Sequence, residues 1–332
     1  MRLTAWAKVF CYASAAMLIA HAAGAQCVMS DKEVIERVDA YAKAGDVKGL
    51  VRFADELHTF HHYGSLLALC QRALSHLQDP AMVAMATRGI AESHEGLKQW
   101  DEGIKVYQNV LDRFPDSDQV PWVRLGIARC HMGKGEYAKA MPLLQDIIQR
   151  WPESDTAAWA WERLGYCYLN MGKPADAEAA VKTALNRYTL EKHPRLMGYH
   201  SVLFMRKEVA LPDLHDAYIA MSKPDAAVAE FKRLRSAYPE IEAETTFWLA
   251  KSLQWQGSYQ QAAAEYEQYL SRWPIQAQMY RLQAMLNAGI SHHLAGSNHK
   301  ARAHWEQLTK EYAFSEPADE ARLWLARLET SE

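Results

Sequence analysis

The stretch that decides the fold reads Arg113-Phe114-Pro115-Asp116-Ser117-Asp118, and it returns as Arg150-Trp151-Pro152-Glu153-Ser154-Asp155. The second copy lies 37 residues after the first, from Pro115 to Pro152. The same shift carries Gly89 onto Gly126. A period in the thirties, built from apolar and helix-favouring residues, is typical of stacked helical hairpins. We therefore expect an all-α array rather than one closed globule.

Length and composition are compatible with such an array. The 332 residues could form two ordinary domains, or one array of about eight helix pairs at this period. Hydrophobic residues make up 49% and charged residues 23% of the chain, which argues against disorder. The net charge is −3 and no segment is a basic block. This distribution argues against nucleic acid as the main ligand.

The first 25 residues have the pattern of a secretory signal peptide. Arg2 and Lys8 precede the apolar run from Val9 to Ala20, and Ala23-Gly24-Ala25 provides a small-x-small cleavage site. We expect cleavage after Ala25 and location in the periplasm. An uncleaved inner-membrane anchor is the alternative, although the apolar run is shorter than the ~20 residues of a membrane span. A lipoprotein is disfavoured because Gln26, not a small residue, precedes Cys27.

Four cysteines follow the predicted cleavage site: Cys27, Cys70, Cys130 and Cys167. None belongs to a C-x-x-C motif, so redox catalysis is not expected. Two interpretations stay open. The cysteines act as small buried hydrophobic residues, or export places them in an oxidising compartment where a disulfide such as Cys27–Cys70 forms.

Within one period the pattern W-x2-L-G-x2-Y-x3-G-x4-A is filled by Trp161, Leu164, Gly165, Tyr168, Gly172 and Ala177. This pattern resembles the tetratricopeptide repeat, whose helix pairs end at a proline. A second good copy runs from Leu249 to Pro274. Weaker copies begin near Leu214 and Ala288. The resemblance covers roughly residues 81–327 and implies a right-handed superhelical solenoid of helical hairpins.

Each repeat position has a physical role. Gly126, Gly165 and Gly289 allow the first helix to approach its neighbour, and large side chains such as Tyr266 and Trp305 fill the space around them. We expect the second-helix alanines to have the same role as these glycines, and we expect three further glycines to end first helices in a left-handed conformation. The alanines are Ala140, Ala177 and Ala262, and the glycines are Gly135, Gly172 and Gly257. Ser117 and Asp155 are the predicted N-caps of the helices that follow the prolines.

The repeat register divides the chain into six predicted segments. Residues 26–80 are helical by periodicity but match the signature poorly, and residues 190–211 interrupt the spacing of the repeats as an inserted helix or bend. The complete division is a signal peptide (1–25), divergent N-terminal hairpins (26–80), an array of about three repeats (81–189), the insertion (190–211), a second array of about three repeats (212–313) and a capping helix (314–332).

A narrower resemblance concerns the leader, the Trp-Leu-Ala first helices and the R-W-P-x-S turns. Together these are similar to the envelope tetratricopeptide proteins of Gram-negative bacteria. That group includes the periplasmic coordinator of the Tol–Pal system and the repeat lipoprotein of the outer-membrane β-barrel assembly machine. The chain lacks the coiled-coil segment of the first and the lipid-attachment cysteine of the second. The resemblance implies a non-enzymatic scaffold in cell-envelope assembly or maintenance.

The resemblance also implies which residues line the inner wall of the solenoid and contact an extended segment or helix of a partner protein. These are Val123, Ile127, Trp159, Glu162, Tyr166, Asn170, Glu244, Phe247, Lys251 and Gln254. Aromatic side chains beside isolated polar groups suit peptide capture. The alternatives are that Trp159 and Phe247 pack against the next repeat, and that Glu162 and Lys251 are solvated surface.

No sequence motif indicates a metal, a cofactor or an active site. His58, His61 and His62, and the pair His292-His293, lack the spacing of an H-E-x-x-H motif. We expect these histidines at the surface or at helix caps, with no metal bound. Nucleophile-elbow, P-loop and dinucleotide-binding motifs are absent, so we expect no cofactor and no enzyme.

Two other functional classes stay open. An accessory of a hydrolase or carbohydrate-processing activity would show two converging carboxylates in a deep, closed pocket. A self-associating architectural protein would expose Leu323, Trp324 and Leu325 near the cap.

Overall fold

The computed structural model describes residues 30–59, 61–188, 210–273 and 280–331. Within these ranges the chain consists of α-helices joined by short turns, with a single 3-10 turn and no β-strand. The predicted all-α fold is confirmed. The predicted signal peptide, Cys27, Pro274 and nearly all of the insertion 190–211 lie outside the described residues, and these predictions stay untested.

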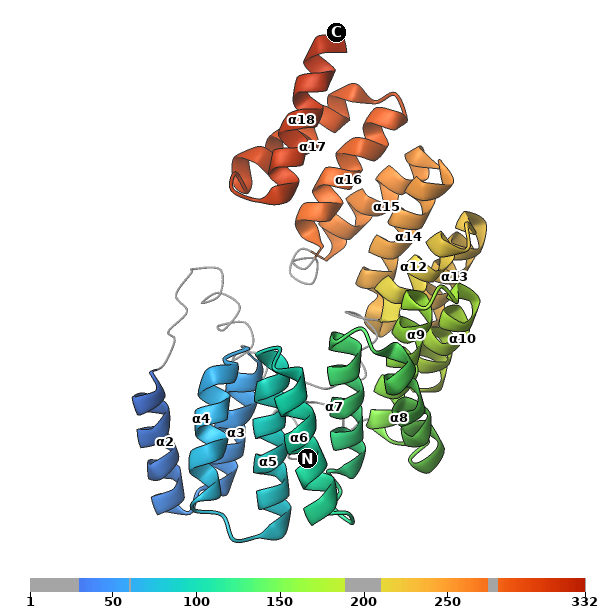
Figure 1. Ribbon diagram of the computed structural model, residues 1–332. Helices are drawn as coiled ribbons and strands as arrows, with labels where there is room; N and C mark the ends of the chain where they lie inside the picture. Colours follow the sequence, from blue (N-terminus) through green and yellow to red (C-terminus); the bar gives the residue numbers. More distant parts are fainter. Residues whose placement is uncertain (1–29, 60, 189–209, 274–279, 332) are drawn as a thin grey trace, which may run out of the picture. The chain divides into compact units, whose positions relative to one another are not determined.

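The chain divides after Gly133 into two compact units. In the N-terminal unit each helix from α4 onward packs on the next one in the chain, and α2 packs on both α3 and α4. Figure 1 shows these helices in blue to green, standing side by side. They are α2 (Asp31–Ala44), α3 (Val47–Thr59), α4 (Tyr63–Leu74), α5 (Pro80–Gly96), α6 (Trp100–Arg113) and α7 (Val120–Gly133).

In the C-terminal unit successive helices form hairpins that pack on their neighbours (Figure 1). The first helices of its hairpins are α9 (Asp155–Asn170), α12 (Leu211–Ala220), α14 (Glu242–Gln256) and α16 (Arg281–Leu294). The second helices are α10 (Pro174–Arg187), α13 (Pro224–Ala237), α15 (Tyr259–Arg272) and α17 (Asn298–Glu311). Helix α8 (Tyr137–Arg150) precedes them, η2 (Pro239–Ile241) leads into α14, and α18 (Glu316–Ser331) ends the unit.

Helix ends follow the sequence signals at the glycines, but neither predicted N-cap is correct: α7 begins at Val120, so Ser117 does not directly precede it. Gly135, Gly172 and Gly257 have φ values of 74°, 70° and 88°, as expected for residues that end a helix in the left-handed region. The N-cap of α9 is Ser154, whose hydroxyl accepts a hydrogen bond from the Ala157 N–H at 3.1 Å. The prediction of Asp155 at this position is wrong: Asp155 is the first helical residue, where its charge favours the helix dipole.

The hairpins pack through small residues that face large ones. A Cβ atom added at Gly126 would overlap the ring of Tyr107 on α6, and one added at Gly289 would overlap the indole of Trp305 on α17. Both rings are completely buried. Ala140, Ala177 and Ala262 are buried too. The predicted role of these small residues in close helix approach is confirmed.

The C-terminal end has its own core around Trp305. The Trp305 Nε1–H donates to the Leu286 carbonyl at 3.2 Å, and the Trp324 ring stacks on the Trp305 ring with centroids 5.6 Å apart. Trp324 and Leu325 are thereby half-buried, whereas Leu323 is 62% exposed. The self-association alternative requires all three side chains to be exposed. Only Leu323 is exposed, and Trp324 and Leu325 pack partly against the core.

The described cysteines are buried thiols. Cys70, Cys130 and Cys167 are each at most 4% exposed and none forms a disulfide. Burial raises the pKa of Cys70 and of Cys167 to about 12, which makes both thiols unreactive at neutral pH. They act as small hydrophobic residues. The alternative disulfide Cys27–Cys70 involves a residue outside the described ranges.

None of the helices in the described ranges is both long and apolar enough to cross a lipid bilayer.

Replacing Gly126 by alanine tests the close approach. The Tyr107 ring has little freedom to move aside, because it is buried and its hydroxyl donates to Glu95 Oε2 at 2.9 Å. We expect Gly126→Ala to lower the free energy of unfolding by about 1–3 kcal/mol, measured by urea denaturation followed by circular dichroism. Gly64→Ala is the matched control, since Gly64 lies in α4 with no atom within 4 Å of an added Cβ. It should leave stability unchanged or raise it by up to about 1 kcal/mol. Equal effects of the two changes would contradict the packing role of Gly126.

Candidate functional site

The first helices of the C-terminal unit form one layer, in which α9 contacts α12, α12 contacts α14 and α14 contacts α16. We call these four helices the first-helix layer. Eight of the ten residues predicted to contact a partner lie on two of its members, α9 and α14. The first-helix layer is therefore the candidate binding surface.

The predicted contact residues differ in how much surface they offer. Trp159, Glu162, Glu244 and Phe247 are buried. Phe247 packs against the next hairpin, as the alternative interpretation predicts: its ring stacks on Tyr280 with centroids 4.4 Å apart. Glu162 is completely buried, so the alternative of a solvated surface residue is wrong for it.

The remaining four predicted residues of the layer keep accessible surface. Tyr166 is 37% exposed and Asn170 is exposed, both on α9. Lys251 and Gln254 on α14 are half-buried. Of the eight predicted residues on α9 and α14, these four have the accessible surface that contact with a partner requires. For the four buried residues, contact with a partner stays a prediction.

Val123 and Ile127 belong to the N-terminal unit. Both lie on α7, with 0% and 6% of their surface exposed. They contribute to packing, and partner contact by these two residues stays an untested prediction.

A lysine side chain lies against tryptophan rings on α14. Lys251 Nζ lies 4.8 Å from the centroid of the Trp248 ring, and the buried His215 ring lies 5.1 Å from Trp248 and 6.3 Å from Trp255. Trp255 is 36% exposed. We call His215, Trp248, Lys251 and Trp255 the aromatic–lysine patch. Such a patch offers a flat apolar ring for stacking beside a cation that can bind a carbonyl or carboxylate.

Burial determines the charge state of the two basic groups in this patch. It lowers the pKa of Lys251, while the neighbouring Asp216 carboxylate partly opposes the shift. It also lowers the pKa of His215, again opposed by Asp216. At neutral pH His215 is therefore a neutral imidazole. Neither of its ring nitrogens makes a hydrogen bond within the described part of the structure.

Two carboxyl groups lie buried where α9 and α12 pack together. Glu162 is 0% and Asp213 is 9% exposed; we call them the acid pair. Arg163 Nε lies 3.2 Å from Glu162 Oε2, and a hydrogen bond between the two carboxyl groups contributes to their pKa shifts. Burial, followed by the charge of Glu162, raises the pKa of Asp213 to about 8. Burial likewise raises the pKa of Glu162. The Asp213 carboxyl therefore keeps its proton near neutral pH.

The acid pair does not have the accessibility that a hydrolase requires. Two converging carboxylates are what the enzyme alternative predicts, but a glycosidase needs them to flank a bound substrate. Since Glu162 has no exposed surface, no substrate reaches it in this conformation.

Sequence reasoning missed Asp213 and His215. They lie on α12, whose weak copy of the repeat signature begins at Leu214. The available signal was the presence of Asp213, His215 and Asp216 among the apolar residues of α12.

The prediction for the histidines is wrong for His292. It is 6% exposed and lies inside the packed helices of the C-terminal unit, rather than at the surface or a cap.

Replacing Asp213 by asparagine tests the raised pKa. The folded protein keeps the Asp213 proton up to about pH 8, whereas the unfolded chain loses it near the ordinary value of 3.8. The stability that the protonated Asp213 contributes is therefore present below that value and is lost as the pH rises towards 8. We expect the melting temperature of Asp213→Asn, relative to the unmodified chain, to increase from about pH 5 to about pH 8.5. Asp216→Asn, an exposed position on the same helix, should show no such trend. A difference that does not change with pH would refute the assignment.

Family models of the tetratricopeptide repeat match residues 96–160, 132–191, 213–274 and 283–315. No curated protein matches the sequence.

Several solved structures resemble the fold. The C-terminal part of a tetratricopeptide repeat-containing protein from Cytophaga hutchinsonii aligns with a TM-score of 0.51 and 16% identity, covering 81% of this chain and 98% of that one. PilW, described as a widely conserved type IV pilus biogenesis factor, aligns with a TM-score of 0.51 and 17% identity over 71% of this chain and 97% of its own. At these identities the likeness concerns the fold alone. Since the repeat models together match more than half of the residues, the chain belongs to the tetratricopeptide repeat family.

Proposed function

We propose that this protein is a non-enzymatic scaffold that binds a segment of a partner protein on its first-helix layer, with the aromatic–lysine patch as the anchor. Tetratricopeptide repeats suit protein–protein interaction, because stacked hairpins expose an extended surface. The partner is thus a protein or peptide, and the accessible side chains on α9 and α14 support the first-helix layer as its surface.

The observation that carries the proposal is the partial exposure of Trp255 beside Lys251. An indole that shows a third of its surface can still bury area against a partner, and tryptophan is among the residues that contribute most at interfaces. The neighbouring ammonium group is held over Trp248 and is partly desolvated. It therefore gives up little further hydration when a partner carbonyl or carboxylate binds it.

The polar groups buried in the same layer support a partner that supplies hydrogen bonds. Both ring nitrogens of His215 lack hydrogen bonds in the described residues, which costs free energy in the unbound protein. An extended segment presents backbone N–H and C=O groups at regular intervals. Such a segment would satisfy groups at the edge of the layer once small side-chain movements expose them.

A double substitution in the aromatic–lysine patch tests this surface. We expect Lys251→Ala with Trp255→Ala to weaken partner binding at least about tenfold, because a central interface residue contributes 1 kcal/mol or more. Both side chains keep exposed surface, so the fold should persist, as checked by circular dichroism. The measurement is affinity capture from envelope extracts, followed by titration of each captured protein with the purified variants.

Phe314→Ala is the control, since Phe314 is fully exposed in the turn between α17 and α18, away from the first-helix layer. It should retain every captured protein. If the double variant also retained all of them at unchanged affinity, the first-helix layer would not be the binding surface.

We also propose that the protein is exported to the periplasm and works in assembly or maintenance of the cell envelope. The support is the leader-like composition of residues 1–25 and the similarity of the leader and P-x-S turns to envelope repeat proteins. A periplasmic scaffold would find its partners among envelope proteins.

Export predicts a processed N-terminus. When the full chain is expressed in a Gram-negative host, we expect the protein in the osmotic-shock fraction with Gln26 as its first residue, read by N-terminal sequencing. Replacing Ala23 and Ala25 with bulky residues should block cleavage, because the signal peptidase requires small side chains at these positions. An intact N-terminus on protein from the cytoplasmic fraction would contradict the proposal.

A further inference from the structure

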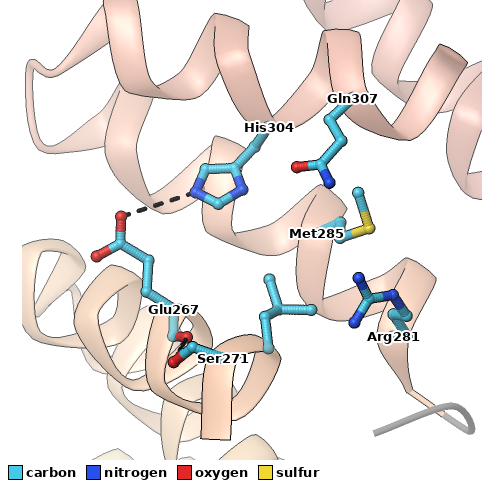
Figure 2. A pocket seen from close by; sticks show the side chains of 7 residues that line it. Glu267, Ser271, Arg281, Met285, His304 and Gln307 are labelled. Atoms are coloured by element: carbon cyan, nitrogen blue, oxygen red, sulfur yellow. Dashed lines mark hydrogen bonds and ion pairs between the residues drawn. The ribbon is translucent and has the colours of Figure 1, made fainter. Parts of the chain in front are cut away.

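A second cluster of chemically reactive side chains lies outside the first-helix layer's binding patch, near the C-terminus. Glu267 on α15, His292 on α16 and His304 on α17 come from three consecutive helices, each packed on the next. His292 Nε2 lies 2.8 Å from Glu267 Oε1, and His304 Nε2 lies 3.7 Å from the same oxygen. All three ligand atoms lie within 4.8 Å of one another. Figure 2 shows Glu267 and His304 facing each other across this gap.

The surroundings close the cluster on one side and open it on the other. His292 is buried, and its ring stacks on the His304 ring with a centroid separation of 5.6 Å and an interplanar angle of 12°. On the open side a pocket of about 240 Å³ is lined by Glu267, Arg281, Met285, His304 and Gln307, among others (Figure 2). An ion can therefore enter from solvent, and water has room to bind it.

From this geometry we propose that Glu267, His292 and His304 form a binding site for a divalent transition-metal ion, with Zn²⁺ as the best match. Two imidazole nitrogens and one carboxylate oxygen, with a fourth position left to water, are a common ligand set for this ion. Imidazole nitrogen also excludes Ca²⁺ and Mg²⁺ as the preferred ions, since these take oxygen ligands.

The required movements are small. Zn²⁺ binds nitrogen and oxygen ligands at about 2.0–2.2 Å, which places the ligand atoms of a tetrahedral site about 3.3 Å apart. The two nitrogen-to-oxygen separations, 2.8 Å and 3.7 Å, lie on either side of that value. The two imidazole nitrogens lie no more than 4.8 Å apart, so they have to approach each other by at most about 1.5 Å, a distance that side-chain rotation can cover.

Metal binding at this site displaces one proton from His292. A carboxylate only accepts hydrogen bonds, so in its contact with Glu267 the His292 Nε2 atom carries a proton. The incoming ion replaces that proton, which moves to Nδ1 or to solvent. The nearest cation is Lys300, with its Nζ 3.7 Å from Glu267 Oε1. Its side chain is half exposed, so it can swing away when the ion binds.

The site would join three helices through one ion. This would fix the C-terminal hairpins as a unit, independently of any partner on the first-helix layer. The inference therefore does not rest on the proposed scaffold function.

Titration of the full chain with ZnCl₂ tests the site. The protein is first dialysed against EDTA, and binding is followed by isothermal calorimetry and by the visible absorption of Co²⁺ as a spectroscopic substitute. We expect the unmodified chain to bind one equivalent of Zn²⁺. His304→Gln and Glu267→Gln each remove a ligand, so each should lower the Zn²⁺ affinity by more than the about 10- to 100-fold lost when an outer hydrogen-bond partner is removed. MgCl₂ should give no corresponding signal. Zn²⁺ should also raise the melting temperature of the unmodified chain and leave that of the two variants unchanged.

His299→Gln is the matched control, because His299 lies on the same helix α17 and is exposed. It should keep the equivalent and the rise in melting temperature. Circular dichroism confirms that each variant is folded, and Glu267→Gln, which nearly conserves size, provides a second variant if His304→Gln is unstable. Absence of the equivalent in the unmodified chain, or its retention in either variant, would overturn the proposal.

Discussion

The structure depends on one packing constraint, the close approach of helix backbones where a small residue faces a large ring. Gly126 leaves room only for the flat ring of Tyr107, and Gly289 does the same for Trp305. Each ring is fully buried, so its apolar area contributes stability while its polar atom finds a nearby partner. A similar approach occurs on α9, where a Cβ added at Gly165 would overlap the Val181 side chain on α10. Successive first helices of the C-terminal unit also contact one another and so form the first-helix layer.

Tight packing of that layer has a consequence for its polar side chains. Glu162 and Asp213 lie where α9 and α12 meet, and burial there raises the pKa of both carboxyl groups, so that Asp213 keeps its proton near neutral pH. A pair of this kind contributes less to stability than well-packed apolar residues would. The partly exposed Trp255 and the half-buried Lys251 lie on the neighbouring helix α14. Under the proposed function, the same layer would hold both a buried acid pair and the surface that contacts a partner.

The Glu267–His292–His304 cluster has the same structural origin. In a stack of hairpins each helix touches the one before and the one after, so side chains at one level on three consecutive helices converge. Convergence of two imidazoles and a carboxylate needs no special loop or strand. A repeat fold can therefore acquire a metal site by a few substitutions on helices whose positions are already fixed, and such a site adds a cross-link between hairpins.

The fold class, the repeat period and the residues that hold the helices together could all be predicted from the sequence. Gly126, Gly165 and Gly289, the helix-ending glycines and the buried alanines were all predictable, because their roles are local: close approach, left-handed conformation and small volume at fixed spacing. The resemblance to the repeat family also predicted a candidate surface on α9 and α14.

The exposure of individual side chains could not be predicted, because it depends on how separate helices pack. Phe247 is covered by Tyr280 and Glu162 lies under α12, and neither contact follows from spacing within one helix. The cluster of Glu267, His292 and His304 was invisible for the same reason. Its members are 25 and 37 residues from Glu267 along the chain, and only the packing of three helices brings their ligand atoms together.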